Sequence, residues 1–364
     1  MKEIINDREI LLEAVKKDGS ALRYASEELK NDREIVLEAV KADGKVQYAS
    51  EVPNYGFALE YASEKLRNDR EIVLEAVKAN GGALEYASEE LRNDREVVLS
   101  AIRSKLYLYD RDPYGVSDRT DIIKYGWVLE YGSEELRNDS NFVLEAVKAD
   151  GMALEYASEK LRNDRDIVLE AVKADGNALK YASEELKNDR EIVLAAIKSI
   201  SYYIEGDPFG TTCKLKKIRH VFALEYASEE LRNDRAIVLE AVKADGMALK
   251  YGSEELRNDR EIVLEAVKAN GGALEYASEE LRNDRDFVLE AVKANGIALQ
   301  FANEKLRNDY EIVLKAIKKD EHSLQYANKK LKSTIEHLIS RRNKKNKCPQ
   351  ITKNDSNNRN NEER

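Results

Sequence analysis

The sequence predicts an all-α fold, an α-solenoid of about eleven helix-turn-helix repeats of 25 residues, with three insertions on one edge. An Asn-Asp pair opens one near-identical unit after another, and seven of the ten steps between openings are 25 residues long. The composition agrees, because 36% charged residues, 42% hydrophobic residues and only 4 prolines are typical of a helical protein with a large surface. The openings lie at residues 6, 31, 68, 93, 138, 163, 188, 233, 258, 283 and 308.

The unit over residues 68–92 shows how one repeat is expected to fold. Asn68 is a suitable helix cap and Glu71 completes a capping box, so a first helix should begin there. It should end at Asn80-Gly81, where the glycine supplies the left-handed terminating conformation. A second helix is then expected to turn the following apolar residues to one side: Ala83, Leu84, Tyr86, Ala87 and Leu91.

One unit alone cannot bury its own apolar faces. Ile72, Val73, Leu74, Ala76 and Val77 give the first helix an apolar arc of about 200°, which requires neighbours on both flanks. Helices of about 10 to 12 residues are marginal in isolation, so stability is expected to come from the interfaces between units. The repeated Glu and Lys positions form acid-rich ridges, which we interpret mainly as a solvated face and alternatively as a surface for a basic partner.

A tyrosine recurs at one position of the second helix. A stacking row for bases or sugars is one interpretation, but Phe301 stands in the same place, so the hydroxyl is dispensable there. We therefore favour packing at the core boundary. The tyrosines are Tyr24, Tyr48, Tyr61, Tyr86, Tyr131, Tyr156, Tyr181, Tyr226, Tyr251, Tyr276 and Tyr326.

The unit 68–92, read as NDREIVLEAVKANGGALEYASEELR, resembles the repeats of the DUF4116 family, a domain of unknown function. The resemblance extends from residue 6 to about residue 332. It implies a helical repeat protein and supplies no catalytic positions to carry over. The occurrence of such repeats in intracellular bacteria, large viruses and protists implies a role at a host-cell interface.

Three insertions interrupt the array at about residues 45–56, 103–127 and 198–222, each between the first and second helix of its unit. Because that turn recurs on one edge of the stack, the insertions should emerge on one side. The two larger ones share the chemistry of a type I turn, Asp112-Pro113-Tyr114-Gly115 and Asp207-Pro208-Phe209-Gly210. Three units apart, they should lie roughly 30 Å from each other.

The larger insertions contain the candidate partner-binding residues. Tyrosine and tryptophan often anchor protein interfaces, although the same residues also suit a local mini-core. The basic residues of the second insertion are suited to an acidic partner or a phosphate, or simply to solvent. The aromatic candidates are Tyr107, Tyr109, Tyr114, Tyr125, Trp127, Tyr202, Tyr203 and Phe209, and the basic candidates are Lys214, Lys216, Lys217 and Arg219.

No catalytic or metal-binding motif is present in the sequence. The three histidines lack a zinc-ligand spacing, and there is no phosphate-binding glycine loop or serine elbow. Cys213 and His220 on one insertion are a weak pattern for a thiol nucleophile. We therefore expect no enzyme activity, no metal and no cofactor.

Composition also bears on location and domain organisation. Only two cysteines are present and no segment is apolar enough to span a membrane, so we expect an intracellular, cytoplasmic protein, with delivery into a host cell as an alternative. The net charge of −10 makes nucleic acid an unsuitable partner for the array. We expect the array to span residues 1–332, followed at 333–364 by a capping segment and a disordered basic, Asn-rich tail.

Three functions fit these features. The first is a non-catalytic scaffold that presents the aromatic insertions and the acidic ridges to a protein partner. The second is a binder of nucleic acid or phosphate through the basic insertion and the tail. The third is a repeat array with a mechanical or structural role.

Overall fold

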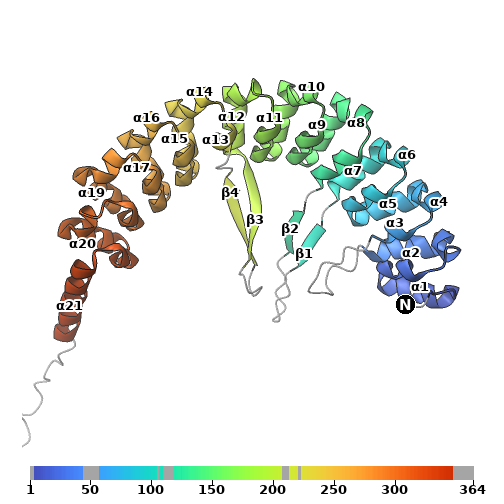
Figure 1. Ribbon diagram of the computed structural model, residues 1–364, viewed down its shortest axis with the longest axis horizontal. Helices are drawn as coiled ribbons and strands as arrows, with labels where there is room; N and C mark the ends of the chain where they lie inside the picture. Colours follow the sequence, from blue (N-terminus) through green and yellow to red (C-terminus); the bar gives the residue numbers. More distant parts are fainter. Residues whose placement is uncertain are drawn as a thin grey trace, which may run out of the picture. The chain divides into compact units, whose positions relative to one another are not determined.

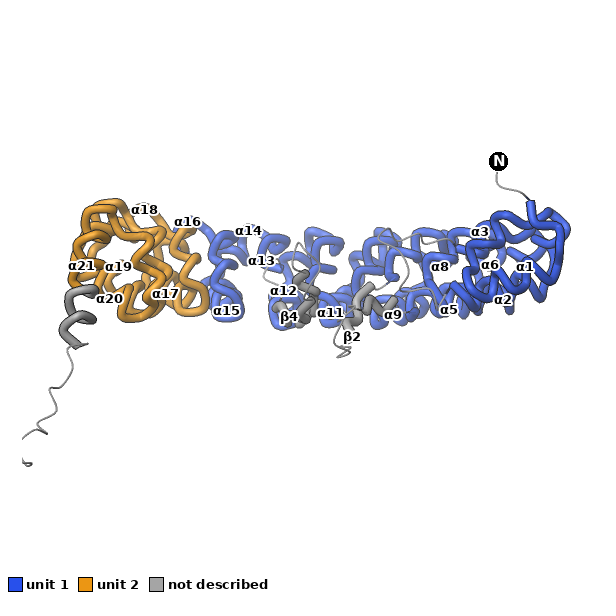
Figure 2. Tube along the Cα trace, turned by 90° about the horizontal axis from the view of Figure 1, so that it is seen from below, with its two compact units in different colours: residues 1–256 blue, residues 257–364 orange. Residues whose placement is uncertain are grey.

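A computed structural model describes residues 4–43, 57–104, 106–109, 119–123, 125–206, 213–219 and 223–346 (Figure 1). The chain divides into two compact units, Met1–Leu256 and Arg257–Arg364 (Figure 2). Within each unit, repeats follow one another as stacked helical layers, as the sequence predicts for a solenoid. No helix in the described residues is long and apolar enough to cross a membrane.

Each repeat begins with one long helix. Successive long helices pack side by side, as α5 does against α7. Those in the described residues are α1 (Arg8–Lys17), α2 (Arg33–Asp43), α5 (Arg70–Ala79), α7 (Arg95–Arg103), α9 (Ser140–Ala149), α11 (Arg165–Ala174), α12 (Arg190–Lys198), α15 (Arg235–Ala244), α17 (Arg260–Ala269), α19 (Arg285–Ala294) and α20 (Tyr310–Lys319).

Two short helical segments complete each repeat. The first is usually a 3₁₀ helix: η1 (Gly19–Tyr24), α3 (Ala58–Tyr61), η3 (Gly81–Tyr86), η4 (Gly126–Tyr131), η5 (Gly151–Tyr156), η6 (Gly176–Tyr181), α13 (Ala223–Tyr226), η8 (Gly246–Tyr251), η9 (Gly271–Tyr276), η10 (Gly296–Phe301) and η12 (Glu321–Tyr326). The second is η2 (Leu29–Asn31), α4 (Glu64–Arg67), α6 (Glu89–Arg92), α8 (Glu134–Asn138), α10 (Glu159–Arg162), η7 (Leu186–Asn188), α14 (Glu229–Arg232), α16 (Glu254–Arg257), α18 (Glu279–Asn283), η11 (Leu306–Asn308) or α21 (Lys329–Asn346).

The single second helix expected from the sequence is therefore wrong. In the unit 68–92, Ala87 and Ser88 are extended between η3 and α6. The Ser88 amide leaves the helical pattern because it donates to the Arg67 carbonyl of the preceding repeat at 2.9 Å. The Ser88 hydroxyl then accepts from the Leu91 amide at 3.2 Å and starts a new short helix.

The predicted helix cap is also displaced by one residue. Asp69, not Asn68, caps α5, and its Oδ1 accepts from the amides of Glu71 and Ile72. Asn68 instead accepts, through its side-chain oxygen, from the hydroxyl of Ser88 in the same repeat at 2.5 Å. The asparagine of the pair thus ties the opening of the repeat to its second short segment, and the aspartate starts the long helix.

Gly81 has a different role from the predicted left-handed helix end. The chain leaves α5 through an extended Asn80, whose side chain caps η3 by accepting from the Gly82 amide at 3.0 Å. A Cβ atom on Gly81 would lie 2.4 Å from the carbonyl oxygen of Ala101 in the next repeat. Glycine is needed there because the neighbouring backbone is so close.

The core follows the predicted apolar pattern. Ile72, Val73, Ala76 and Val77 of α5 are buried, and their counterparts are buried in the other long helices between α1 and α20. The first repeat shows what a neighbour contributes: Ile10 is 61% exposed, whereas the equivalent Ile72 is 0% exposed. Fully burying such a side chain contributes about 1.5–3 kcal/mol.

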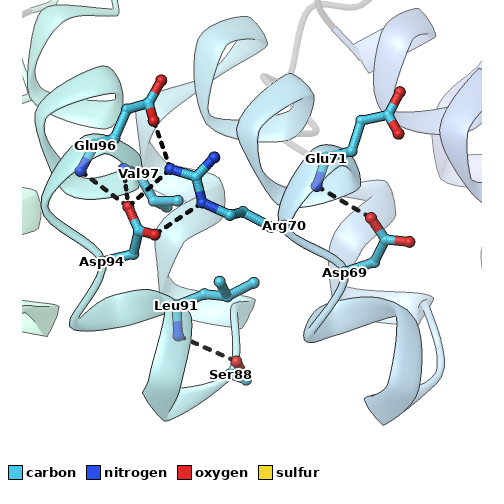
Figure 3. A network of polar contacts seen from close by, with 8 residues as sticks. All are labelled: Asp69, Arg70, Glu71, Ser88, Leu91, Asp94, Glu96 and Val97. Atoms are coloured by element: carbon cyan, nitrogen blue, oxygen red, sulfur yellow. Dashed lines mark hydrogen bonds and ion pairs between the residues drawn. The ribbon is translucent and has the colours of Figure 1, made fainter.

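Arginine connects most of the long helices to the next one within a unit. Arg70 donates from Nε to Asp94 at 2.8 Å and from Nη2 to Glu96 at 2.5 Å (Figure 3). Asp94 also caps α7, since its Oδ1 accepts from the Glu96 and Val97 amides. The same arginine–aspartate pair recurs as Arg8–Asp32, Arg33–Asp69, Arg95–Asp139, Arg165–Asp189, Arg190–Asp234, Arg260–Asp284 and Arg285–Asp309.

The pattern changes at the last helix. Thr334 occupies the place of the capping aspartate, and its hydroxyl donates back to the Lys330 carbonyl at 3.0 Å, as within a continuous helix. α21 therefore runs without a break through residues 333–346 of the predicted capping segment. The rest of the predicted tail, residues 347–364, lies outside the described residues.

The glycine contact gives a first test. Gly151→Ala would place a Cβ 2.3 Å from the Ala171 carbonyl oxygen and should lower the free energy of unfolding by about 1–3 kcal/mol. Gly252→Ala is the matched control, since its nearest contacts are 3.4 Å and most repeats have alanine there. Chemical denaturation measures the free energy of unfolding of both variants. Equal values would contradict the interpretation that Gly151 is glycine because the neighbouring backbone is close.

The arginine pair can be separated from the helix cap. Asp94 both caps α7 and binds Arg70, whereas Asp164 caps α11 with Ser140 in place of the arginine. Asp94→Ala and Asp164→Ala should both lose about 1 kcal/mol of capping energy, with up to about 1 kcal/mol more at Asp94. Thermal denaturation measures the difference. Ser140→Arg should give Asp164 an arginine partner, so that Asp164→Ala in this background loses as much stability as Asp94→Ala. An unchanged loss would show that the arginine contributes no stability.

Acid should weaken the same joints. Hydrogen bonding by the Arg70 guanidinium holds the pKa of Asp94 below its ordinary value of 3.8. A lowered folded-state pKa contributes stability above the unfolded-state pKa and loses it as the pH falls through the folded-state pKa. The melting temperature should therefore fall below about pH 4, and Arg70→Gln should show a smaller fall. An equal fall in the melting temperature of the unchanged protein and of Arg70→Gln would exclude the Arg70–Asp94 pair as a cause of the acid sensitivity.

Candidate interaction surface

Both larger insertions leave the array at the same point of their repeats. One follows α7 and precedes η4, and the other follows α12 and precedes α13. The polypeptide leaves through Ser104 and Ser199, both buried, whose hydroxyls donate to the carbonyls of Ala101 and Ala196. In Figure 1 both insertions project from the same side of their unit. The first insertion, at about residues 45–56, follows α2 and precedes α3 in the sequence and lies outside the described residues.

Each larger insertion forms an antiparallel β-hairpin, which the all-α prediction did not include. β1 (Leu106–Tyr109) pairs with β2 (Arg119–Ile123), and β3 (Ile200–Gly206) pairs with β4 (Cys213–Arg219). Tyrosine, isoleucine and threonine favour strands, so the local composition differs from that of the repeats. The two predicted turns, at 112–115 and 207–210, lie outside the described residues.

The two hairpins come together although they originate three repeats apart along the array. Cα atoms of β2 and β3 approach within 8 Å, so the expected separation of roughly 30 Å is wrong. A strand of seven residues spans about 23 Å, which allows a hairpin to reach well beyond its own repeat. The hairpins thus bring together two distant parts of the sequence.

Most predicted site residues fall on these strands. Tyr107 and Tyr109 belong to β1, Tyr202 and Tyr203 to β3, and the four basic candidates Lys214, Lys216, Lys217 and Arg219 to β4. The register places Tyr202 opposite Lys217 and Tyr203 opposite Lys216. Tyr114 and Phe209 lie outside the described residues.

Tyr125 and Trp127 belong to the array itself. Tyr125 is 4% exposed, so its ring is unavailable to a partner, and we assign it to packing rather than to partner binding. Trp127 is half-buried between Tyr125 and Tyr131, with ring centroids 6.1 and 5.8 Å away. Trp127 therefore marks the surface directly beside the base of the first hairpin.

The recurrent tyrosines among the described residues are half-buried, as expected for packing at the core boundary, and Tyr48 lies outside the described residues. Burial raises the pKa of Tyr181 to about 12, with the Glu155 carboxylate adding to the effect. Burial likewise raises the pKa of Tyr131, next to Glu85 and Glu130. Tyr131 and Tyr181 thus each meet a carboxylate from their own repeat or the preceding one.

The described residues contain no group of three or more side chains suited to hold a metal ion. One open groove follows α12, lined by Asp189, Arg190, Glu191, Leu194, Ala195 and Lys198. Asp189 and Arg190 already bind Arg165 and Asp234 of neighbouring repeats. The groove therefore offers no arrangement of acid, base and nucleophile.

The family model for a domain of unknown function, DUF4116, matches nine overlapping segments of the chain. They are residues 7–51, 52–92, 69–110, 121–162, 164–205, 216–257, 237–282, 259–303 and 284–332. The chain belongs to the DUF4116 family. No curated protein matches the chain. The matched segments cover the helical repeats, and the strands of the hairpins lie at the ends of these segments or between them.

Proposed function

We propose that this DUF4116 protein is a non-catalytic scaffold that binds a protein partner through its hairpin-bearing edge. The observation that carries the proposal is the approach of β2 to β3. Two insertions from repeats far apart in the sequence converge, and a bipartite surface of this kind suits a macromolecule better than a small ligand. The repeats supply the rigid base from which the hairpins project.

The composition of the strands supports a protein partner. β1 and β3 together contribute four tyrosines, which are frequent among the residues that dominate interface energetics. The hairpins also have strand edges, whose free backbone groups can pair with an extended segment of another chain.

Binding of nucleic acid or phosphate is the second candidate. It is favoured by β4, where three lysines and one arginine occupy seven residues, with tyrosines opposite two of the lysines. Basic and aromatic side chains together are typical of surfaces that bind single strands. The net charge of −10 opposes this function outside the hairpin.

An affinity capture from cell lysate tests the scaffold proposal. The intact chain is compared with a variant in which residues 106–123 and 201–219 are each replaced by Asp-Gly-Gly, leaving buried Ser104, Ser199 and Tyr125 in place. We expect a protein partner to be retained only by the intact chain, with equal helical circular dichroism for both. Equal recovery by both chains would overturn the role of the hairpins.

Two further variants separate the two candidates. One replaces Tyr107, Tyr109, Tyr202 and Tyr203 by alanine, and the other replaces Lys214, Lys216 and Lys217 by glutamine. If the tyrosine variant fails to capture the partner, and nuclease does not affect capture by the intact chain, the protein scaffold is supported. If only the lysine variant fails, and capture by the intact chain is sensitive to nuclease and salt, the nucleic-acid function is supported instead.

A further inference from the structure

One position of the repeat varies far more than its neighbours. It is the second residue of the first short segment in most repeats. In the repeats with α3 and α13 it is the residue that directly precedes the helix. We call it the variable position. Its occupants range from glycine to tryptophan: Ser20, Phe57, Gly82, Trp127, Met152, Asn177, Phe222, Met247, Gly272, Ile297 and His322.

Exposure alone does not explain this variation. The position that Glu89 occupies, directly after Ser88, is exposed in all eleven repeats, yet it is glutamate in ten of them. The variable position is mostly only half-buried. A site that changes while more exposed sites stay constant indicates that each repeat presents its own residue to a ligand.

A second variable residue lies three positions later on the same segment. In a 3₁₀ helix, residues three apart lie on the same face, so Trp127 and Glu130 share one face of η4. This later residue is glutamate at Glu60, Glu85, Glu130, Glu155, Glu225 and Glu275, a cation at Arg23, Lys180 and Lys250, and glutamine at Gln300 and Gln325.

The segments that carry the faces used here are neighbours in the array, η3 against η4 and η4 against η5, so these faces adjoin. The Glu85 carboxylate acts on Tyr131 of the next repeat, Glu130 acts on Tyr131 and Tyr156, and Glu155 acts on Tyr156 and Tyr181. We call the segment formed by Glu85, Tyr86, Glu130, Tyr131, Glu155 and Tyr156 the acidic–aromatic strip. Trp127 lies within it, 5.8 Å from Tyr131.

The chain itself shows what such tyrosines accept. Where the later residue is a lysine, its ammonium lies over the tyrosine of the same repeat, at 5.3 Å for Lys180 on Tyr181 and 5.4 Å for Lys250 on Tyr251. In the acidic–aromatic strip the later residue is glutamate, and no described lysine or arginine lies over Tyr86, Tyr131 or Tyr156. A cation supplied from outside would meet both a ring and a carboxylate there.

We propose that the acidic–aromatic strip binds an extended polypeptide segment that places one lysine or arginine on each successive repeat, with apolar residues against Trp127. Neighbouring repeats are about 8–10 Å apart when helices pack normally. A ligand in the polyproline II conformation has three residues per turn and rises about 3.1 Å per residue, so every third side chain lies on the same face, about 9 Å further along, and meets a new repeat. The inference deepens the proposed scaffold function and rests on its partner being a protein.

Fluorescence anisotropy with a labelled peptide of four Leu-Ser-Lys triplets tests the strip. We expect the full chain to bind this peptide, with affinity falling as salt rises, and not to bind four Leu-Ser-Glu triplets. A peptide of the same composition with its lysines clustered at one end should bind at least about tenfold more weakly. Equal binding of the spaced and clustered peptides would overturn the one-cation-per-repeat arrangement.

Two matched charge reversals locate the site. Glu130→Lys should weaken binding at least about tenfold, because Glu130 follows Trp127 on η4 and its carboxylate acts on both Tyr131 and Tyr156 of the strip. Glu134→Lys changes the same charge four residues away on α8 and should change the dissociation constant less than about twofold. Equal loss in both variants would show only general attraction to an acidic protein, and no loss in either would place the peptide elsewhere.

The hairpin-shortened chain separates this inference from the proposed function. Peptide binding that survives removal of the hairpins, while the lysate partner is lost, assigns the strip and the hairpins to separate contacts. Capture of the lysate partner without any peptide binding overturns the strip and leaves the scaffold function standing. Binding of an oligothymidylate in preference to the peptide would overturn the peptide as the ligand.

Discussion

The burial of one long helix by the next is the interaction on which the rest of the structure depends. Each helix uses an apolar side chain such as Ile72 to contact the preceding repeat, and its burial contributes about 1.5–3 kcal/mol. The arginine–aspartate pair at the same joint is exposed and contributes about 0–1 kcal/mol. Apolar contact therefore supplies most of the stability, and we infer that the arginine pair mainly fixes how one repeat is placed on the next.

The aspartate of the Asn-Asp pair links helix formation to the contact between repeats. Asp94 starts α7 and accepts from Arg70 of the preceding repeat, while Asn68 accepts from Ser88 within its own repeat. Helix formation and repeat stacking thus share the same atoms, so a repeat with a misplaced neighbour also loses part of its helix cap. That coupling explains how short helices, marginal by themselves, become cooperative when stacked.

The sequence predicted the repeat, its period and its core well, because apolar periodicity and a recurring dipeptide report directly on local folding. It failed where the decisive contact came from another repeat. Ser88 ends η3 by donating to a carbonyl of the preceding repeat, and Gly81 is glycine because of the Ala101 carbonyl in the next one. The hairpins were missed because the helical period of the repeats set the expectation for the insertions. The approach of β2 to β3 depends on three-dimensional reach, which spacing along the chain does not contain.

The joints between repeats have nearly the same chemistry on both sides, which has a consequence for how such a chain changes over generations. Unequal recombination between near-identical 25-residue coding segments can add or remove a whole repeat while every remaining joint stays intact. The two uninterrupted repeats that open at 138 and 163 set the distance between the origins of the hairpins. The distance between the hairpin origins therefore changes only by whole repeats. The gain or loss of one repeat would change which strands meet without changing the sequence of any strand.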